Sequence, residues 1–316
     1  GLGLREQTLG RDSKAGASSL NNLAVLYQET ARFNEAETYF QEALNVVDKQ
    51  FGKESHEYAV VLNNQAIFFA KVGRTDQAVS NLNTAIGIVG KINSKSKRTE
   101  VGFQSNLAML YQEQGKLTEA EAVYLKLEKM LRLLGDKTFY AGVLNNLALL
   151  YIQMEKVDKV ENYLKEAAQI YQTKLGKESP NYAKVLGDLG NFYRMQGRYA
   201  EAEENLNKSL TINGTALNTN HPDYVKAQED LAILYWKKGD MAKADASYTI
   251  AMDKSLEFIN QYFPPMSEAE KTKYWDVLAP RFQRFYNFAV ESSTENIHIV
   301  QDLYDYQIAT KALLLS

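Results

Sequence analysis

One recurring segment constrains the fold of this chain more than any other feature. LNNLAVLY at 20–27 returns as LNNQAIFF at 62–69 and as LNNLALLY at 144–151. If the second residue after the first asparagine serves as an anchor, six copies follow one another at steps of 40 or 42 residues: Leu23, Gln65, Leu107, Leu147, Leu189 and Leu231. A period of this length indicates an array of similar units, each packed mainly against its neighbours.

Each unit has the pattern of a helical hairpin. Apolar residues recur at spacings of three and four, which is typical of amphipathic helices. An aromatic residue follows each anchor by four positions, and a turn residue follows it by eight; the turn residue is glycine in four units, at Gly73, Gly115, Gly197 and Gly239. The residue thirteen positions after the anchor is alanine in five units and Val160 in the fourth, so two helices are expected to approach closely there.

The segments between the units carry signals for helix ends. Gly52, Gly135 and Gly176 follow apolar runs and are predicted to end helices as C-caps. Ser179 before Pro180 is predicted to begin a helix, and Pro222 repeats that position 42 residues later. No segment has a clear strand pattern, so the predicted fold class is all-α.

The period, the hairpin and the order of leucine, small, aromatic, alanine and aromatic residues resemble the tetratricopeptide repeat (TPR) family. The long unit, with IYQTKLGKESPNYAKVL at 170–186, is similar to the repeats of kinesin light chains and of bacterial multidomain TPR proteins. The resemblance covers residues 1 to about 262, with 1–17 as the tail of a preceding unit. It implies a right-handed superhelical solenoid whose first helices line a concave groove.

The helical wheel divides the asparagine pair. At about 100° per residue, Asn146 lies nearly opposite the apolar face of Leu144 and Leu147, whereas Asn145 lies on a flank and is predicted to be structural. By the resemblance, the face that carries Asn146 is the groove wall. One row of that wall is predicted to be Asn22, Asn64, Asn106, Asn146, Asp188 and Asp230, and the next Val25, Ile67, Met109, Leu149, Asn191 and Ile233.

Two interpretations of these rows are open. Amides both donate to and accept from a peptide backbone, and exposed aliphatics bury its side chains, so the rows could hold an extended peptide. Alternatively, each asparagine bonds the neighbouring repeat and fixes the superhelical twist. Groove asparagines of kinesin light chains and the four aliphatics of the first units favour binding. The lysine-rich carboxylate clamp of chaperone-binding TPR proteins is not predicted, because Asp188 and Asp230 lie among Lys184, Arg194, Lys226 and Lys237.

The repeat register ends after Asp253, and an aromatic-rich segment follows. A helix is predicted from a capping box at Ser267 through Phe288, kinked or divided at Pro280, and a second from about Asn296. The opening YFPPMSEAEK and the closing ATKALLLS resemble the segment that joins bacterial TPR arrays to a CHAT domain, a caspase-like peptidase with a His and Cys dyad. The predicted organisation is therefore a TPR array at 1–262 and a helical extension at 263–316. The alternative is a terminal helix pair that only caps the solenoid.

Several kinds of chemistry have no support in the sequence. The net charge of −3 argues against nucleic acid, and the absence of cysteine excludes disulfides and thiolate sites. His56, His221 and His298 have no partner at metal spacing, and the recurring glutamates, such as Glu37 and Glu203, are predicted to be solvated. We therefore expect no enzyme, no metal and no cofactor. No apolar run approaches the roughly 18 residues of a membrane span, and the opening lacks a signal pattern, so we expect a cytoplasmic protein whose natural N-terminus precedes Gly1.

These observations predict a non-catalytic module that binds a partner protein or an extended peptide in its groove. The resemblance of residues 263–316 adds that the module regulates or targets an attached CHAT peptidase, with which it is in possible intramolecular contact. The alternative is a free-standing adaptor of kinesin-light-chain type. A hydrolase activity within 254–316 is a third hypothesis, for which no chemical motif exists.

Overall fold

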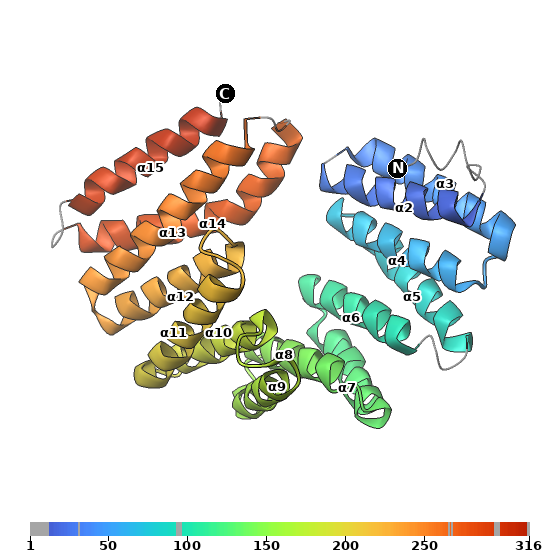
Figure 1. Cartoon of the computed structure of the whole chain (residues 1–316), viewed down its shortest axis with the longest axis horizontal. Coiled ribbons are helices and arrows are strands. Elements are labelled where there is room, and N and C mark those ends of the chain that lie inside the picture. Colours follow the sequence, from blue (N-terminus) through green and yellow to red (C-terminus); the bar gives the residue numbers. More distant parts are fainter. Residues whose placement is uncertain are drawn as a thin grey trace. The chain divides into compact units, whose positions relative to one another are not determined.

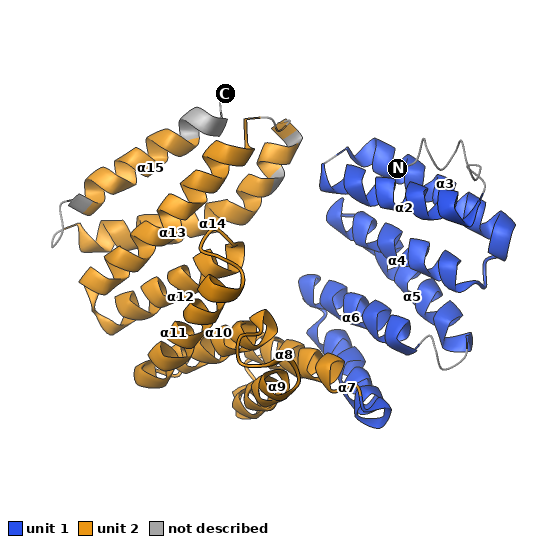
Figure 2. Cartoon of the chain, in the orientation of Figure 1, with its two compact units in different colours: residues 1–135 blue, residues 136–316 orange. Residues whose placement is uncertain are grey.

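The computed structural model describes residues 13–30, 32–92, 97–264, 266, 268–293 and 298–314. The chain divides into two compact units, residues 1–135 and 136–316 (Figure 2). The repeat tail predicted at 1–17 and the capping box at Ser267 lie largely outside the described residues. Within the described ranges every regular element is helical, so the predicted all-α class is confirmed.

Unit 1 consists of consecutive helical hairpins (Figure 1). They are α2 (Lys14–Glu29) with α3 (Phe33–Phe51), α4 (His56–Lys71) with α5 (Thr75–Lys91), and α6 (Lys97–Glu113) with α7 (Leu117–Leu134). The helices of each hairpin pack on one another, and the second helix packs on the first helix of the next hairpin. Each hairpin therefore buries its apolar faces on both sides, as expected of a solenoid.

Unit 2 continues the pattern and then departs from it. Its hairpins are α8 (Lys137–Gln153) with the short 3₁₀ helix η2 (Val157–Lys159) and α9 (Val160–Leu175), α10 (Pro180–Met195) with α11 (Tyr199–Ala216), and α12 (Pro222–Lys238) with α13 (Met241–Tyr262). Two further helices, α14 (Glu268–Ser292) and α15 (His298–Leu314), pack against α13 and against each other. The predicted boundary between residues 262 and 263 stays a prediction.

The small residues predicted at the hairpin crossings are fully buried. Ala36, Ala78, Ala120, Ala202 and Ala244 have no exposed surface, and neither has Val160. A larger side chain at such a contact would push the two helices apart. The sequence alignment of the six hairpins is therefore correct at the position where the two helices of each hairpin cross.

The predicted helix ends are also confirmed. Gly73 and its three counterparts adopt positive φ angles of 71° to 83°, and Glu155, in the fourth hairpin, takes the same conformation with φ 59°. Gly52, Gly135 and Gly176 end α3, α7 and α9. Ser179 stands before α10 as predicted, although its side chain makes no capping bond.

In three of the hairpins, side chains near the turn bond a glutamate of the preceding hairpin. In unit 2 the hydroxyl of Tyr193 donates to Glu161 Oε1 at 3.0 Å, and Arg198 Nη1 donates to Glu161 Oε2 at 2.7 Å. Tyr235 and Lys238 bond Glu203 in the same way, and Arg74 of unit 1 bonds Glu37 at 2.6 Å. The prediction that Glu37 and Glu203 are merely solvated is therefore wrong, because each ties one hairpin to the next.

Of the two outcomes predicted at Pro280, a kink or a division of the helix, the structure excludes the division. Helix α14 continues through Pro280, although proline removes one backbone hydrogen bond. Residues beyond the proline hold the helix: Phe285 and Phe288 lie with ring centres 5.7 and 4.9 Å from that of the buried Tyr248. None of the described helices is both long enough and apolar enough to span a membrane.

Candidate partner-binding site

The first helix of each hairpin carries the residues predicted to bind a partner. In unit 1 these helices are α2, α4 and α6, and adjacent ones contact each other. In unit 2 they are α8, α10 and α12, of which α10 contacts α12. We call the predicted surfaces the unit 1 face and the unit 2 face, and each is described on its own.

The asparagines of the unit 1 face bond one another across repeats. Asn64 Nδ2 donates to Asn21 Oδ1 at 3.2 Å, and one repeat later Asn106 Nδ2 donates to Asn63 Oδ1 at 2.9 Å. Asn21 and Asn63 are buried, whereas Asn64 and Asn106 are half-buried. The asparagine at the second position of one repeat thus donates a hydrogen bond to the buried asparagine at the first position of the preceding repeat. This bond fixes the register of the two helices.

The unit 2 face contains a related contact with an acidic partner. Asn145 is buried, as expected of a structural residue, and its Nδ2 donates to Asp188 Oδ2 at 3.1 Å. Burial raises the pKa of Asp188, and the bond from Asn145 and the charges of Lys226 and Lys184 oppose that shift. Asp230 has no such asparagine, because Gly187 occupies the corresponding position, and it accepts from Lys226 Nζ at 2.5 Å instead.

The structure therefore shows an inter-repeat contact for residues at the second position of the asparagine pair, and their contact with a ligand stays a prediction. Three of the residues predicted to face a ligand form a side-chain hydrogen bond with the preceding repeat: Asn64, Asn106 and Asp188. Asn22 and Asn146 differ, since neither makes a side-chain hydrogen bond within the described ranges. The inter-repeat interpretation holds for three of the six positions, and Asn64 Oδ1 also accepts from Asn63 Nδ2 at 3.2 Å.

The aliphatic row is less exposed than predicted. Ile67 and Met109 are 40% and 48% exposed, but Val25, Leu149 and Ile233 are half-buried. Val25 packs against the hydrophobic core of unit 1. The four exposed aliphatics expected in the first units are therefore two, and they lie on neighbouring helices. The polar member of the row, Asn191, is also half-buried.

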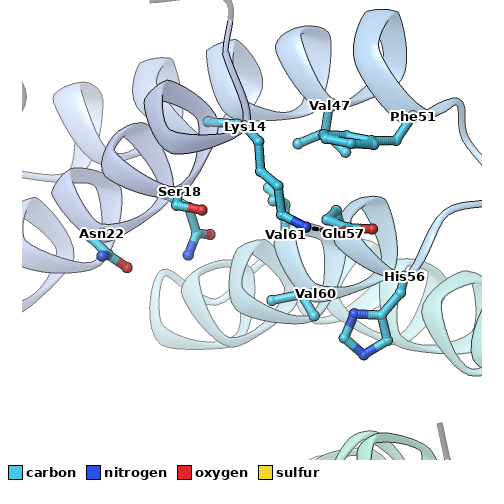
Figure 3. A pocket seen from close by; sticks show the side chains of 11 residues that line it. Lys14, Ser18, Asn22, Val47, Phe51, His56, Glu57, Val60 and Val61 are labelled. Atoms are coloured by element: carbon cyan, nitrogen blue, oxygen red, sulfur yellow. Dashed lines mark hydrogen bonds and ion pairs between the residues drawn. The ribbon is translucent and has the colours of Figure 1, made fainter. Parts of the chain in front are cut away.

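Two hollows open on unit 1. One, of about 250 Å³, lies between α2 and α4 at the end of α3 and is lined in part by Ser18, Asn22 and Val60. Figure 3 shows Lys14 extending across it to Glu57, with Nζ and Oε1 2.8 Å apart. The other, which we call the aliphatic hollow, has a volume of about 310 Å³ between α4 and α6, and Ile67, Asn106, Met109 and Leu110 line it, with Lys71 and Glu113 beside them.

Unit 2 has a charged hollow on its face, which we call the arginine hollow. It measures about 480 Å³ and joins α10, α12 and α14 through Asn191, Arg194, Lys226, Ile233, Arg281 and Arg284. The sequence predicted Asn191, Asp230 and Ile233 for this surface but not the two arginines of the extension. Their spacing of three places both on one side of α14, but only the fold shows that this side meets α12.

The arginine hollow is built around a buried carboxylate. Glu229 is 4% exposed, and its two oxygens accept from Arg281 Nε at 3.0 Å and Arg284 Nε at 2.6 Å. Arg281 also donates to Ser255 Oγ at 3.0 Å. Arg194 donates to Asn191 Oδ1 at 3.3 Å, and burial lowers its pKa. A buried carboxylate with two charged partners anchors the extension firmly to the last hairpin.

The histidines have structural contacts. His56 Nε2 lies 3.1 Å from Thr99 Oγ1, and His221 Nδ1 accepts from the backbone N–H of Asp223 at the start of α12. The side chain of His298 lies outside the described residues. No group of three or more potential metal ligands occurs in the part of the chain that the structure describes.

The paired helices, the buried small residues and the stacked first helices define a solenoid of the kind that typically serves as a scaffold for protein interactions. The sequence matches the tetratricopeptide repeat family over residues 4–89, 102–173, 139–215 and 181–253, and the chain belongs to that family. None of the curated proteins matches the chain.

Several solved structures of differently named proteins are similar to this chain. BtubC (BKLC) from P. vanneervenii is 22% identical, with a TM-score of 0.63 over 76% of this chain and 95% of that one. Aspartyl phosphate phosphatase F from Bacillus subtilis is 12% identical, with a TM-score of 0.66 over 98% and 72%. A Rap protein complexed with Competence and Sporulation Factor is 14% identical, with a TM-score of 0.63 over 99% and 80%. At these identities the likeness concerns the fold.

Proposed function

We propose that this chain is a non-catalytic interaction module that binds a partner protein or an extended peptide on the faces of its first helices. The aliphatic hollow carries the proposal. Ile67 and Met109 expose apolar surface on adjacent helices, and such surface gains free energy when an apolar side chain covers it. Asn106 lines the same hollow, and its Oδ1 is proposed to accept from a peptide N–H while its Nδ2 bonds Asn63.

The asparagines then have two roles. Asn64, Asn106 and Asp188 hold neighbouring repeats in register and present their remaining polar atoms to the ligand. Asn22, which is exposed, and Asn146, which is half-buried, are proposed to contact the partner directly. The Rap protein, whose solved structure is of a complex with Competence and Sporulation Factor, supports the use of such a solenoid for binding a partner.

A finer proposal concerns the extension. We propose that α14 and α15 lead to a CHAT peptidase that the repeats regulate or target, which is supported by the resemblance of residues 263–316 to CHAT-linking segments. The competing proposal is a free-standing adaptor, for which the likeness to BtubC (BKLC) is the supporting observation. Sequencing the gene beyond the codon for Ser316 separates them: a domain with a His and Cys dyad supports the first, and an immediate stop codon contradicts it.

The binding proposal is tested with the double variant Ile67→Ser and Met109→Ser. A partner is first isolated from lysate of the source organism on the immobilised native protein, and its affinity for both proteins is then measured by calorimetry. We expect at least a tenfold loss of affinity at an unchanged melting temperature, because both side chains are already exposed to water.

The matched control is Leu133→Ser, which removes an 82% exposed leucine of α7 that does not line the aliphatic hollow. It should bind as the native protein does. Equal affinities for all three proteins would show that the partner binds elsewhere, and equal losses would show that general surface apolarity is responsible.

A further inference from the structure

We infer that the arginine hollow is a subsite for an oxyanion, a carboxylate or phosphate group carried by the chain that the module binds. The inference rests on the proposed function, because the partner presents the group. It also gives α14, which lies outside the repeats, a part in recognition.

The two arginines of the extension are not fully compensated. Arg281 and Arg284 share the single carboxylate of Glu229, each through its Nε atom. Two guanidinium groups with one carboxylate leave one positive charge in excess. Arg284 also remains 46% exposed, so its other N–H groups are accessible from the hollow. A guanidinium with accessible N–H groups binds carboxylates and phosphates through paired hydrogen bonds.

Arg194 adds a second uncompensated charge from α10. Its Nε donates to the neutral Asn191, and no carboxylate lies within ion-pairing distance of it among the described residues. Burial is the largest cause of its lowered pKa, with the charge of Asp230 acting in the opposite direction. A cation that has lost water without gaining an ion-pair partner is stabilised by an incoming anion.

The acidic groups of the hollow do not cancel this excess. Asp230 is engaged by Lys226, with Nζ and Oδ2 2.5 Å apart. Asp223 belongs to the first turn of α12, where its carboxylate lies 3.7 Å from His221 Nδ1 and is 59% exposed to solvent. Arg194 of α10 and Arg284 of α14 therefore line the hollow with positive charge in excess, whereas Lys226 of α12 is paired with Asp230.

The size and the remaining walls fit one anionic residue. About 480 Å³ accommodates an aspartate, glutamate or phosphorylated side chain, and Ile233 and Asn191 offer an apolar wall and an amide for the adjoining backbone. The arrangement differs from a lysine clamp built within the repeats, because Arg284 comes from the extension. A chain bound on the unit 2 face is therefore expected to place an anionic side chain between α10, α12 and α14.

The test uses small probes on the intact protein. N-acetyl-phosphoserine amide and N-acetyl-glutamate amide are titrated against the ¹⁵N signals of the arginine side chains at fixed ionic strength, with N-acetyl-glutamine amide as the neutral probe. We expect millimolar binding of the anionic probes, none of the neutral probe, and at least a fivefold weakening in Arg194→Gln and in Arg284→Gln. The tighter of the two anionic probes identifies a phosphate or a carboxylate as the preferred group.

Lys174→Gln is the control, since it removes one exposed positive charge of unit 2 outside the hollow. It should bind both anions as the native protein does. Absence of binding by the native protein, or equal binding by all the variants, would overturn the inference. Arg194→Gln keeps the test decisive if Arg284→Gln loosens α14, because Arg194 does not bond Glu229.

The experiments can contradict the proposed oxyanion subsite without contradicting partner binding at the aliphatic hollow, and the reverse. Because the probes require no natural partner, a negative result with them leaves the affinity measurements on the aliphatic hollow intact. Conversely, loss of the aliphatic-hollow proposal would leave a measured anion site without its assigned partner.

Discussion

At the residue scale, the asparagine pair shows how far the sequence predicts this molecule. The period of 40 or 42 residues correctly placed the turns and the small residues at the helix crossings, and the helical wheel predicted a structural role for Asn145, which is buried. A helical wheel gives the direction of a side chain around its own axis but not the distance to the next helix. For that reason it could not show that Asn106 reaches Asn63 one repeat away.

The fourth turn offers a prediction about backbone conformation. Glu155 adopts φ 59°, where Gly73, Gly115, Gly197 and Gly239 stand in the corresponding turns. A left-handed conformation costs a residue with a Cβ about 1 kcal/mol relative to glycine. We expect Glu155→Gly to raise the free energy of unfolding by about that amount, as measured by urea denaturation. Gly115→Ala is the reciprocal control and should lower it; a destabilised Glu155→Gly would show that the glutamate side chain makes a compensating contact.

The turn of the fifth hairpin offers a prediction about pH. Hydrogen bonds, first from Arg198 and then from Lys165, lower the pKa of Glu161 from 4.5 to about 2. The carboxylate is bound more tightly in the folded state, so its contribution is fully present above pH 4.5 and is lost as the pH falls toward 2. We expect Glu161→Gln to reduce the free energy of unfolding by about 1 kcal/mol at pH 6, a solvent-screened value.

The difference between native protein and Glu161→Gln should shrink steadily between pH 5 and pH 3 when both are unfolded in urea. Lys174→Gln, which leaves this ion pair intact, should show no such convergence. A difference that is constant across this range would mean that the glutamate stabilises the fold by packing and not by charge.

At the scale of secondary-structure elements, the course of α14 in the extension could be predicted from the sequence only in part. The pattern predicted two helices after the array, with the first kinked or divided at Pro280, whereas α14 runs undivided from Glu268 to Ser292. Local propensity is overridden here by contacts with α12 and α13 that are distant in sequence, chiefly those of Arg281, Arg284 and Phe288. The same contacts create the arginine hollow, so the undivided course of α14 and the two arginines that the sequence did not assign to the site have one cause.

The docking of α14 is predicted to depend on Glu229. Glu229→Gln would leave two guanidinium groups beside a neutral amide that accepts at only one oxygen, and breaking a buried ion pair costs about 3 to 5 kcal/mol. We expect faster hydrogen exchange throughout α14 with unchanged exchange in unit 1. Glu204→Gln on α11, which removes only an exposed pair with Lys208, is the control. Unchanged exchange in α14 would show that its aromatic contacts suffice.

At the scale of the whole molecule, the division at residues 135 and 136 suggests that the two units respond differently to a local defect. In a repeat array stability is roughly a sum of unit terms and nearest-neighbour terms, so damage to one unit is felt mainly there. The chain contains two tryptophans, Trp236 and Trp275, and both belong to unit 2. Tryptophan fluorescence therefore reports on unit 2, whereas helical circular dichroism reports on both units.

Ala120→Phe tests this division. Ala120 is fully buried at the crossing of α6 and α7 in unit 1, and a phenyl ring there would force the helices apart at a cost of about 1 to 3 kcal/mol. We expect the melting curve by circular dichroism to gain an earlier transition while the fluorescence transition keeps its native midpoint. The matched variant Ala202→Phe places the same change in unit 2 and should move the fluorescence transition. If Ala120→Phe lowered both transitions together, the two units would unfold as one cooperative array, and ligand binding on one face would then be coupled to the stability of the other.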